Sequence, residues 1–131
     1  MIIKTKHFGE IDIDTQSVIT FSNGLIGFPN HTRFVLIQQE ENSYFFWLQS
    51  IEEPNIAFVV TDPSLFFENY DSEEIWQKID RKLSRLLVIC SKVNQSPVAN
   101  LRAPLIINIV TRYAMQQVLS DSQWTTQHLL I

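Results

Sequence analysis

The feature of this sequence that most constrains its fold is a series of short strand-like segments, each followed by residues typical of turns. Residues 10–14 alternate isoleucine with acidic residues, the period-two pattern of a strand with one buried face. Segments rich in β-branched and aromatic residues predict further strands at 17–21, 34–38, 44–49, 56–61, 86–91, 105–110 and 115–119. Many short strands separated by turns predict a β-barrel or a β-sandwich. We expect a mainly β fold, namely a small antiparallel β-barrel-like single domain over residues 1–131, with one or two short helices.

Turn and helix signals divide these segments. Asn23 and Gly24 form a strong turn signal, because both residue types tolerate positive φ angles. Asp62 followed by Pro63 has the form of a helix N-cap with proline at the first helical position. Residues 73–83 place apolar side chains on one helical face and acids at the N-terminal end, which predicts a helix.

The segment from Asn100 to Asn108 predicts a strand with polar ends. Residues 105–107 form a continuous apolar run, which is typical of a strand covered on both faces. Pro104 lacks a backbone N–H donor and therefore fits the first residue of a strand or an edge position. The side-chain amides of Asn100 and Asn108 can bond backbone groups that would otherwise be unpaired at the two strand ends. This segment predicts a scaffold that holds a binding surface in shape.

Composition excludes several classes of function. The chain has 131 residues, 45% of them hydrophobic, and 10 basic against 14 acidic residues give a net charge of −4. Direct binding of nucleic acid is disfavoured, because neutralising phosphates needs clustered Lys and Arg. Residues 1–6 lack the long apolar region of a secretion signal, and no apolar run approaches the length of a membrane span. We expect a cytoplasmic protein that does not contact a membrane.

Sequence signals for catalysis or metal binding are absent. The three histidines lie far apart, and none has metal-ligand spacing with the single cysteine or with another histidine. No nucleophile elbow, phosphate-binding loop or dinucleotide fingerprint occurs, and the chain contains only three glycines. Cys90 lies in an apolar run and is expected to be a buried small hydrophobe. We predict no catalytic residue, no metal and no cofactor.

Two glycines bend the chain after the Asn-Gly turn. Gly24 and Gly27 lie three residues apart, and Leu25, Ile26 and Phe28 are placed around the bend. These apolar side chains either pack back on the barrel, as in a bulged hairpin, or are displayed to a partner. The residues alone leave both alternatives open.

Four short motifs occur in a fixed order along the chain. They are the loop 24–28, Leu48-Gln49-Ser50, Asp62-Pro63 and the segment 100–104. As an ordered set they resemble the flagellar assembly factor FliW family, and the resemblance extends from Glu10 to about Leu129. The chain departs from the family pattern at Ile26, where proline is common, and at Pro29, where an acid is common. Ala114 replaces a frequent glycine, and Trp124 replaces a tyrosine.

The resemblance implies a non-enzymatic cytoplasmic regulator with a small β-barrel-like fold and two protein partners. One partner is flagellin, bound in the cytosol before export. The other is CsrA, an RNA-binding translational repressor of flagellin. The family implies that CsrA is sequestered without occupation of its RNA-binding site, and that flagellin competes for the same protein. Export of flagellin then restores CsrA binding and allows flagellin translation to resume.

Candidate residues for these contacts are of two kinds. The expected partner-binding residues are Gly24, Leu25, Gly27, Phe28, Glu68, Tyr70, Asp71, Glu73, Glu74 and Arg102. The expected structural residues are Asn100, Pro104, Asn108 and Gln116. For each acid, the alternative is a solvated face or a helix N-terminus. For Arg102, locking the loop of Asn100 and contacting a partner are equally good interpretations.

Two other classes of function remain as alternatives. A small-barrel ligand-binding protein of the flavin type, or a hydrolase, needs a pocket with convergent polar groups and a base of shifted pKa. A nucleic-acid-binding barrel would use aromatic side chains as stacking platforms, and the acidic charge balance disfavours it.

Overall fold

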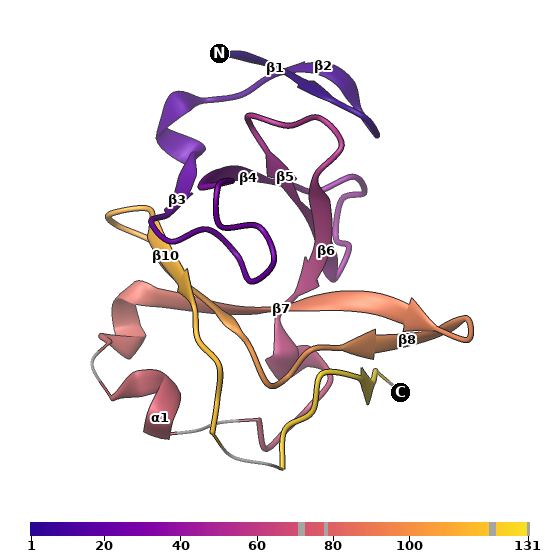
Figure 1. The fold of residues 1–131 in the computed structure, drawn as a ribbon, viewed down its shortest axis with the longest axis vertical. Coiled ribbons are helices and arrows are strands. Elements are labelled where there is room, and N and C mark those ends of the chain that lie inside the picture. Colours follow the sequence, from indigo (N-terminus) through magenta and orange to yellow (C-terminus); the bar gives the residue numbers. More distant parts are fainter. Residues whose placement is uncertain (71–72, 78, 121–122, 131) are drawn as a thin grey trace.

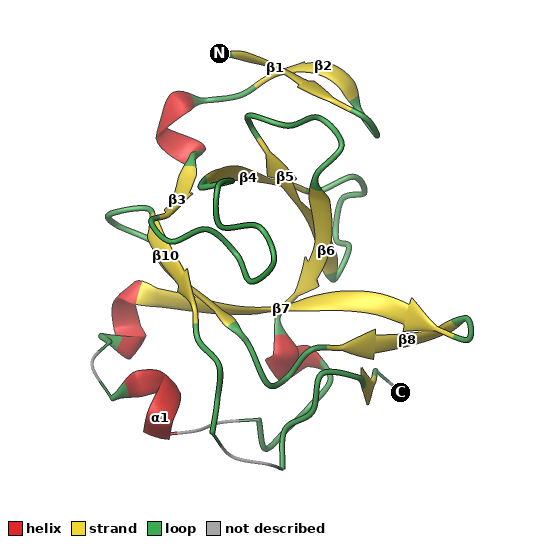
Figure 2. Ribbon diagram, viewed as in Figure 1, coloured by secondary structure: helices red, strands yellow, loops and turns green. Residues whose placement is uncertain are grey.

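The computed structural model describes residues 1–70, 73–77, 79–120 and 123–130. Its strands are β1 (Ile2–Thr5), β2 (Gly9–Asp12), β3 (Ile19–Phe21), β4 (Arg33–Ile37), β5 (Phe45–Ser50), β6 (Ala57–Thr61), β7 (Ser84–Val93), β8 (Ser96–Ala99), β9 (Leu105–Asn108), β10 (Tyr113–Gln116) and β11 (His128–Leu129). The helical segments are α1 (Glu73–Trp76) and three 3₁₀ turns, η1 (Thr15–Ser17), η2 (Pro63–Leu65) and η3 (Arg81–Leu83). The mainly β fold expected from the sequence is confirmed (Figure 2).

Seven strands of the described chain close into a barrel, in the order β3-β4-β5-β6-β7-β9-β10 and back to β3. The ring of strands is visible in Figure 1, with the β1–β2 hairpin at one end of the long axis and α1 near the other. All pairings in the ring are antiparallel except that of β10 with β3, which is parallel. The barrel is therefore mixed, whereas the sequence had predicted an antiparallel one.

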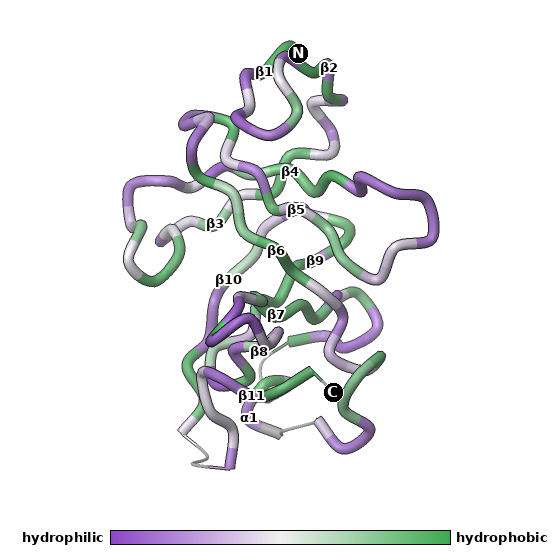
Figure 3. The backbone as a smooth tube through the Cα atoms, turned by 90° about the vertical axis from the view of Figure 1, so that its right-hand side faces the viewer, coloured by the Kyte–Doolittle hydropathy of each residue, from purple (hydrophilic) through white to green (hydrophobic). Residues whose placement is uncertain are grey.

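Strand β9 and the middle of strand β7 are buried on both faces because they separate two apolar cores. Leu87 and Leu105 point into the barrel with the core residues of β3 to β6. Their neighbours Val88 and Ile106 belong to a second core, which includes residues from the segments around α1 and β11. This arrangement explains the continuous apolar run of β9, and the prediction of a strand covered on both faces is confirmed. Hydrophobic stretches follow the strands in Figure 3, and hydrophilic stretches lie largely in the turns.

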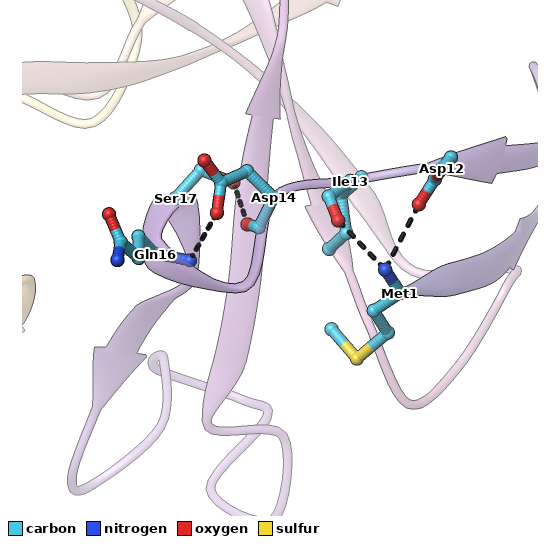
Figure 4. A network of polar contacts seen from close by, with 6 residues as sticks. All are labelled: Met1, Asp12, Ile13, Asp14, Gln16 and Ser17. Carbon is cyan, nitrogen blue, oxygen red and sulfur yellow. Dashed lines mark hydrogen bonds and ion pairs between the residues drawn. The ribbon is translucent and has the colours of Figure 1, made fainter.

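The N-terminal hairpin is held by its own terminus. The ammonium group of Met1 donates to a carboxylate oxygen of Asp12 and to the carbonyl of Ile13, each at 3.0 Å (Figure 4). The Asp14 carboxylate then accepts the backbone N–H of Gln16 and begins η1. Ser17, predicted as the first residue of a strand over 17–21, therefore ends a capped 3₁₀ turn, and β3 begins at Ile19.

The helix predicted over residues 73–83 is wrong in length. The described structure has one helical turn, α1, and a separate 3₁₀ turn, η3. Asp80 interrupts the predicted helix, because it has extended backbone angles and its carboxylate caps the N–H of Lys82. The predicted cap at Asp62 and Pro63 is confirmed, since the Asp62 carboxylate accepts the N–H of Ser64 at the start of η2. None of the described helices has the length and hydrophobicity needed to cross a membrane.

A buried amide organises the turn between β5 and β6. Gln49 is fully buried, and its Nε2 donates to the carbonyls of Ser50, Pro54 and Ile56 at 3.0, 3.3 and 3.2 Å. The hydroxyl of Ser50 accepts the N–H groups of two residues in the same turn. The Gln49 Oε1 atom is buried and has no hydrogen-bond partner among the described residues. The environment of this side chain therefore favours a donor and disfavours a carboxylate.

We predict that Gln49→Glu makes folding stability strongly pH dependent. Burial and the facing carbonyls raise the folded-state pKa of the introduced carboxyl above its unfolded value of about 4.3. The variant should therefore have its full stability below pH 4. Its free energy of unfolding should fall by about 3 kcal/mol as the pH rises through the raised pKa. Urea unfolding at pH 4 and pH 8 measures this loss. Gln39→Glu is the control, because Gln39 is exposed. Equal pH profiles for the two variants would contradict this role of Gln49.

Candidate functional site

A five-residue excursion separates β8 from β9. Both strands pair with the same edge of β7, but residues 100–104 stand opposite only Val88 and Ile89. The N–H of Asn100 still donates to the carbonyl of Ile89 at 2.8 Å. Beyond it, the Asn100 Oδ1 accepts the N–H groups of Arg102 and Ala103, each at 3.1 Å. The predicted use of this amide to bond local backbone is confirmed, and it fixes the excursion as a defined turn.

Tyr70 holds the excursion from its inner side. Its hydroxyl donates to the carbonyl of Leu101 at 2.5 Å. Its ring packs edge to face against the ring of Trp124, with 4.8 Å between the two ring centroids. Burial raises the pKa of the Tyr70 hydroxyl well above its usual range. Tyr70 is thus a neutral donor in the second core, and only 7% of it is exposed.

The loop between β3 and β4 crosses the mouth of the barrel in Figure 1. Leu25 is 3% exposed and belongs to the barrel core, and Phe28 packs against that core. Of the two alternatives for this loop, packing back on the barrel applies to both residues. Ile26, at the tip, is 60% exposed. Gly24 is required here, because it has a φ of +67° and a Cβ would lie 2.4 Å from the carbonyl oxygen of Phe28.

Gln116 joins this loop to the excursion after β8. Its Oε1 accepts the N–H of Ile26 at 2.8 Å, and its Nε2 donates to the carbonyl of Ala103 at 3.2 Å. The bond depends on the departure from the family pattern noted above, because a proline at position 26 would have no N–H to donate. Two loops that are far apart in the sequence therefore form one continuous surface.

The chain after β10 extends this surface toward α1. The N–H groups of Gln117 and Leu119 donate to the carbonyls of Pro104 and Arg102. The Nε2 of Gln117 donates to the backbone carbonyl of Glu74, and the Glu74 carboxylate accepts the N–H and hydroxyl of Ser120 at 3.0–3.2 Å. Val118 lies in the same segment and is 57% exposed. Pairing with Ser120 gives the Glu74 carboxylate a structural partner.

The residues predicted to bind partners have different environments. Gly27 and Glu68 are exposed, Arg102 and Glu74 are half-buried, and Leu25 and Tyr70 are buried. Asp71 lies outside the described residues, and only the backbone of Glu73 is described. Within the described part of the chain, the Arg102 guanidinium makes no hydrogen bond or ion pair, while the Arg102 backbone is bonded on both sides. We define the loop face as the surface formed by Ile26, Arg102, Gln116 and Val118.

Sequence reasoning gave no role to Val118 or Ser120 in forming this surface, and for Ile26 it left packing on the barrel and display to a partner as open alternatives. Their roles depend on contacts made by Gln116 and Glu74 across long sequence separations, which no local pattern reveals. Among the described residues, no group of three His, Cys, Asp or Glu side chains could hold a metal ion. Cys90 is half-buried, and burial raises the pKa of its thiol to about 11, so the thiol is protonated at neutral pH.

Comparison with known proteins gives consistent matches over the whole chain. A model of the family described as FliW protein matches residues 2–130. The flagellar assembly factor FliW of Natranaerobius thermophilus is 40% identical over 139 residues, covering 99% of this chain and 92% of that protein. The same factor from Bacillus velezensis is 38% identical, covering 99% of this chain and 96% of that protein.

The fold matches as well. A solved structure, described as the crystal structure of the flagellar assembly factor FliW, has a TM-score of 0.87 to this chain at 31% identity. The match covers 100% of this chain and 97% of that chain. The barrel, the second core and the connecting loops therefore have the same overall arrangement as in that solved structure.

We predict that Gly24→Ala destabilises the fold more than Gly27→Ala. Both glycines have positive φ angles, so each alanine carries a backbone penalty of roughly 1–2 kcal/mol. Only the new Cβ at position 24 meets neighbouring atoms. The free energy of unfolding of Gly24→Ala should therefore fall by about 2 kcal/mol or more beyond that of Gly27→Ala. Chemical unfolding of the two variants measures the difference, and equal losses would contradict the close packing of this loop.

We also predict that Gln116→Ala loosens the tip of the β3–β4 loop. Loss of the Oε1 acceptor frees the Ile26 N–H, which should exchange with solvent about tenfold faster in an NMR hydrogen-exchange measurement. Gln117→Ala is the matched control, because its side chain bonds Glu74 instead. Unchanged exchange at Ile26 in the Gln116 variant would show that the link is not formed.

Proposed function

Because the chain belongs to the FliW family of flagellar assembly factors, which are not enzymes, we propose that it acts in the cytoplasm by binding two proteins. One is CsrA, whose repression of flagellin translation it antagonises. The other is flagellin, which it holds before export and which competes with CsrA. The observation that supports this proposal most is the family match over residues 2–130.

The proposed antagonism has an electrostatic basis. CsrA must be basic where it holds RNA, and this chain has a net charge of −4. A bound acidic protein lowers the positive potential felt by the RNA phosphates, even if it does not cover the RNA site. The effect should weaken as salt screens the charges, over a Debye length of about 10 Å at 0.1 M.

Glu68, Asp71, Glu73 and Glu74 remain the proposed acidic contacts. These positions differ in how many other contacts a change of charge would disturb. Reversing the charge of Glu74 would also break its hydrogen bonds to Ser120, so a loss of binding there has two explanations. Glu68 is exposed and precedes the anchoring residue Tyr70 by two positions, so its charge can be changed with little effect on packing.

We predict that Glu68→Lys weakens CsrA binding and weakens inhibition of RNA binding, by about threefold to tenfold at low salt. Fluorescence anisotropy with purified CsrA and a gel shift with flagellin leader RNA measure the two effects. Glu10→Lys on β2 is the control, because it changes the net charge equally at another exposed site. Equal losses in the two variants would assign the effect to net charge alone, and no loss in either would exclude Glu68 as a contact. Wild-type protein that binds neither CsrA nor flagellin would contradict the proposed function itself.

A further inference from the structure

The turn that leads from β3 into the β3–β4 loop carries a chemically reactive pair of residues. Asn23 is the only asparagine in the sequence that is followed by glycine. Because glycine has no Cβ beside its backbone nitrogen, this nitrogen can approach the side-chain carbonyl carbon of the preceding asparagine. Asn23 is exposed, so water has access to its side chain. The pair is therefore chemically suited to deamidation, a reaction to which asparagine is prone.

The reaction consumes only water and releases ammonia. The Gly24 nitrogen loses its proton and bonds the Cγ atom of Asn23, while the bond from Cγ to the side-chain nitrogen breaks and ammonia leaves with that proton. The product is a cyclic succinimide, which water opens at one of its two carbonyls. Attack at Cγ gives aspartate. Attack at the main-chain carbonyl gives isoaspartate, in which the main chain runs through Cβ and Cγ.

The folded turn opposes the first step of this reaction. The Gly24 N–H donates to the carbonyl of Phe21 at 2.8 Å, which keeps the proton on the attacking nitrogen and directs that nitrogen toward a carbonyl oxygen. Gly24 is also buried, and atoms of residues 28 and 29 fill the space beside it. The peptide can therefore turn toward the Asn23 side chain only when the loop opens.

A small number of contacts keep the loop closed across the mouth of the barrel (Figure 1). Leu25 and Phe28 exchange backbone hydrogen bonds of 3.3 and 2.8 Å, and the Leu25 side chain lies in the barrel core. The Ile26 N–H donates to Gln116 at 2.8 Å. A slow irreversible reaction follows the population of the open state when opening and closing are fast. These contacts should therefore set the rate of the reaction at Asn23.

The isoaspartyl product does not fit the closed loop. It adds one methylene group, about 1.5 Å of chain, between residue 23 and Gly24. A single Cβ at Gly24 would already lie 2.4–2.8 Å from atoms of residues 28 and 29, so the main chain has no room to widen here. The longer chain must displace Leu25 from the barrel core and separate the Ile26 N–H from its acceptor.

We propose that Asn23 is a covalent modification site, at which the closed β3–β4 loop slows deamidation and isoaspartate, once formed, holds the loop open. The modification is spontaneous and irreversible under these conditions, and it alters the loop face through Ile26. It does not depend on which proteins bind that face.

The first test measures the reaction rate in the full-length protein. Folded protein and protein unfolded in urea are incubated at mildly alkaline pH, and peptide mapping by mass spectrometry gives the products at position 23. Folding should slow the reaction by about tenfold or more. Gln116→Ala should speed it in the folded protein by about threefold to tenfold, because one hydrogen bond of the closed loop is lost. Gln117→Ala is the matched control and should react like wild type, since its side chain bonds Glu74.

Three results of this first test would overturn the proposal. Absence of product at position 23 in unfolded protein would exclude the site. Equal rates in folded and unfolded protein would exclude protection by the turn. Equal folded-state rates in Gln116→Ala and wild type would show that closure of the loop does not control the reaction.

The second test examines the product. Purified isoaspartyl protein is compared with Asn23→Asp, which carries the same charge without the added methylene, and with Asn23→Ser, which cannot react. Hydrogen exchange at the Ile26 N–H should be about tenfold or more faster in the isoaspartyl protein than in wild type. It should stay within about twofold of wild type in both variants, before and after incubation. Unchanged exchange in the isoaspartyl protein, or equally fast exchange in Asn23→Asp, would contradict opening of the loop by the longer main chain.

Discussion

The antiparallel pairing of β7 with β9 is the interaction on which the rest of the structure depends. It closes the barrel, because Ser84 stands opposite Asn108 and Leu87 opposite Leu105. It also separates the two cores, since successive residues of these strands alternate between the barrel interior and the layer beneath it. A shift of one residue in this register would exchange the two sets of side chains, so both cores specify the same alignment.

The surfaces of the molecule follow from this alignment. Strand β8 continues along the edge of β7 that β9 occupies, and the extra residues between them must leave the sheet as the turn at 100–104. Backbone groups in such a turn need partners, which Asn100, Tyr70 and Gln116 supply. At the other end of β9, Asn108 supplies the partners for the turn between β9 and β10. Strand β9 is therefore flanked by two turns that are each fixed by an asparagine side chain.

The sequence predicted features that depend on local chemistry and missed those that depend on distant contacts. Alternating or continuous apolar segments located most of the strands, and the capping role of Asp62 followed from its proline neighbour. Strand β8 was missed because Pro97 suggests a turn, yet Pro97 is tolerated where its missing N–H faces away from β7. The helix at 73–83 was overestimated, because apolar periodicity continues past the break at Asp80. The burial of Leu25 and the link from Gln116 to Ile26 join residues far apart in sequence, so no local pattern could reveal them.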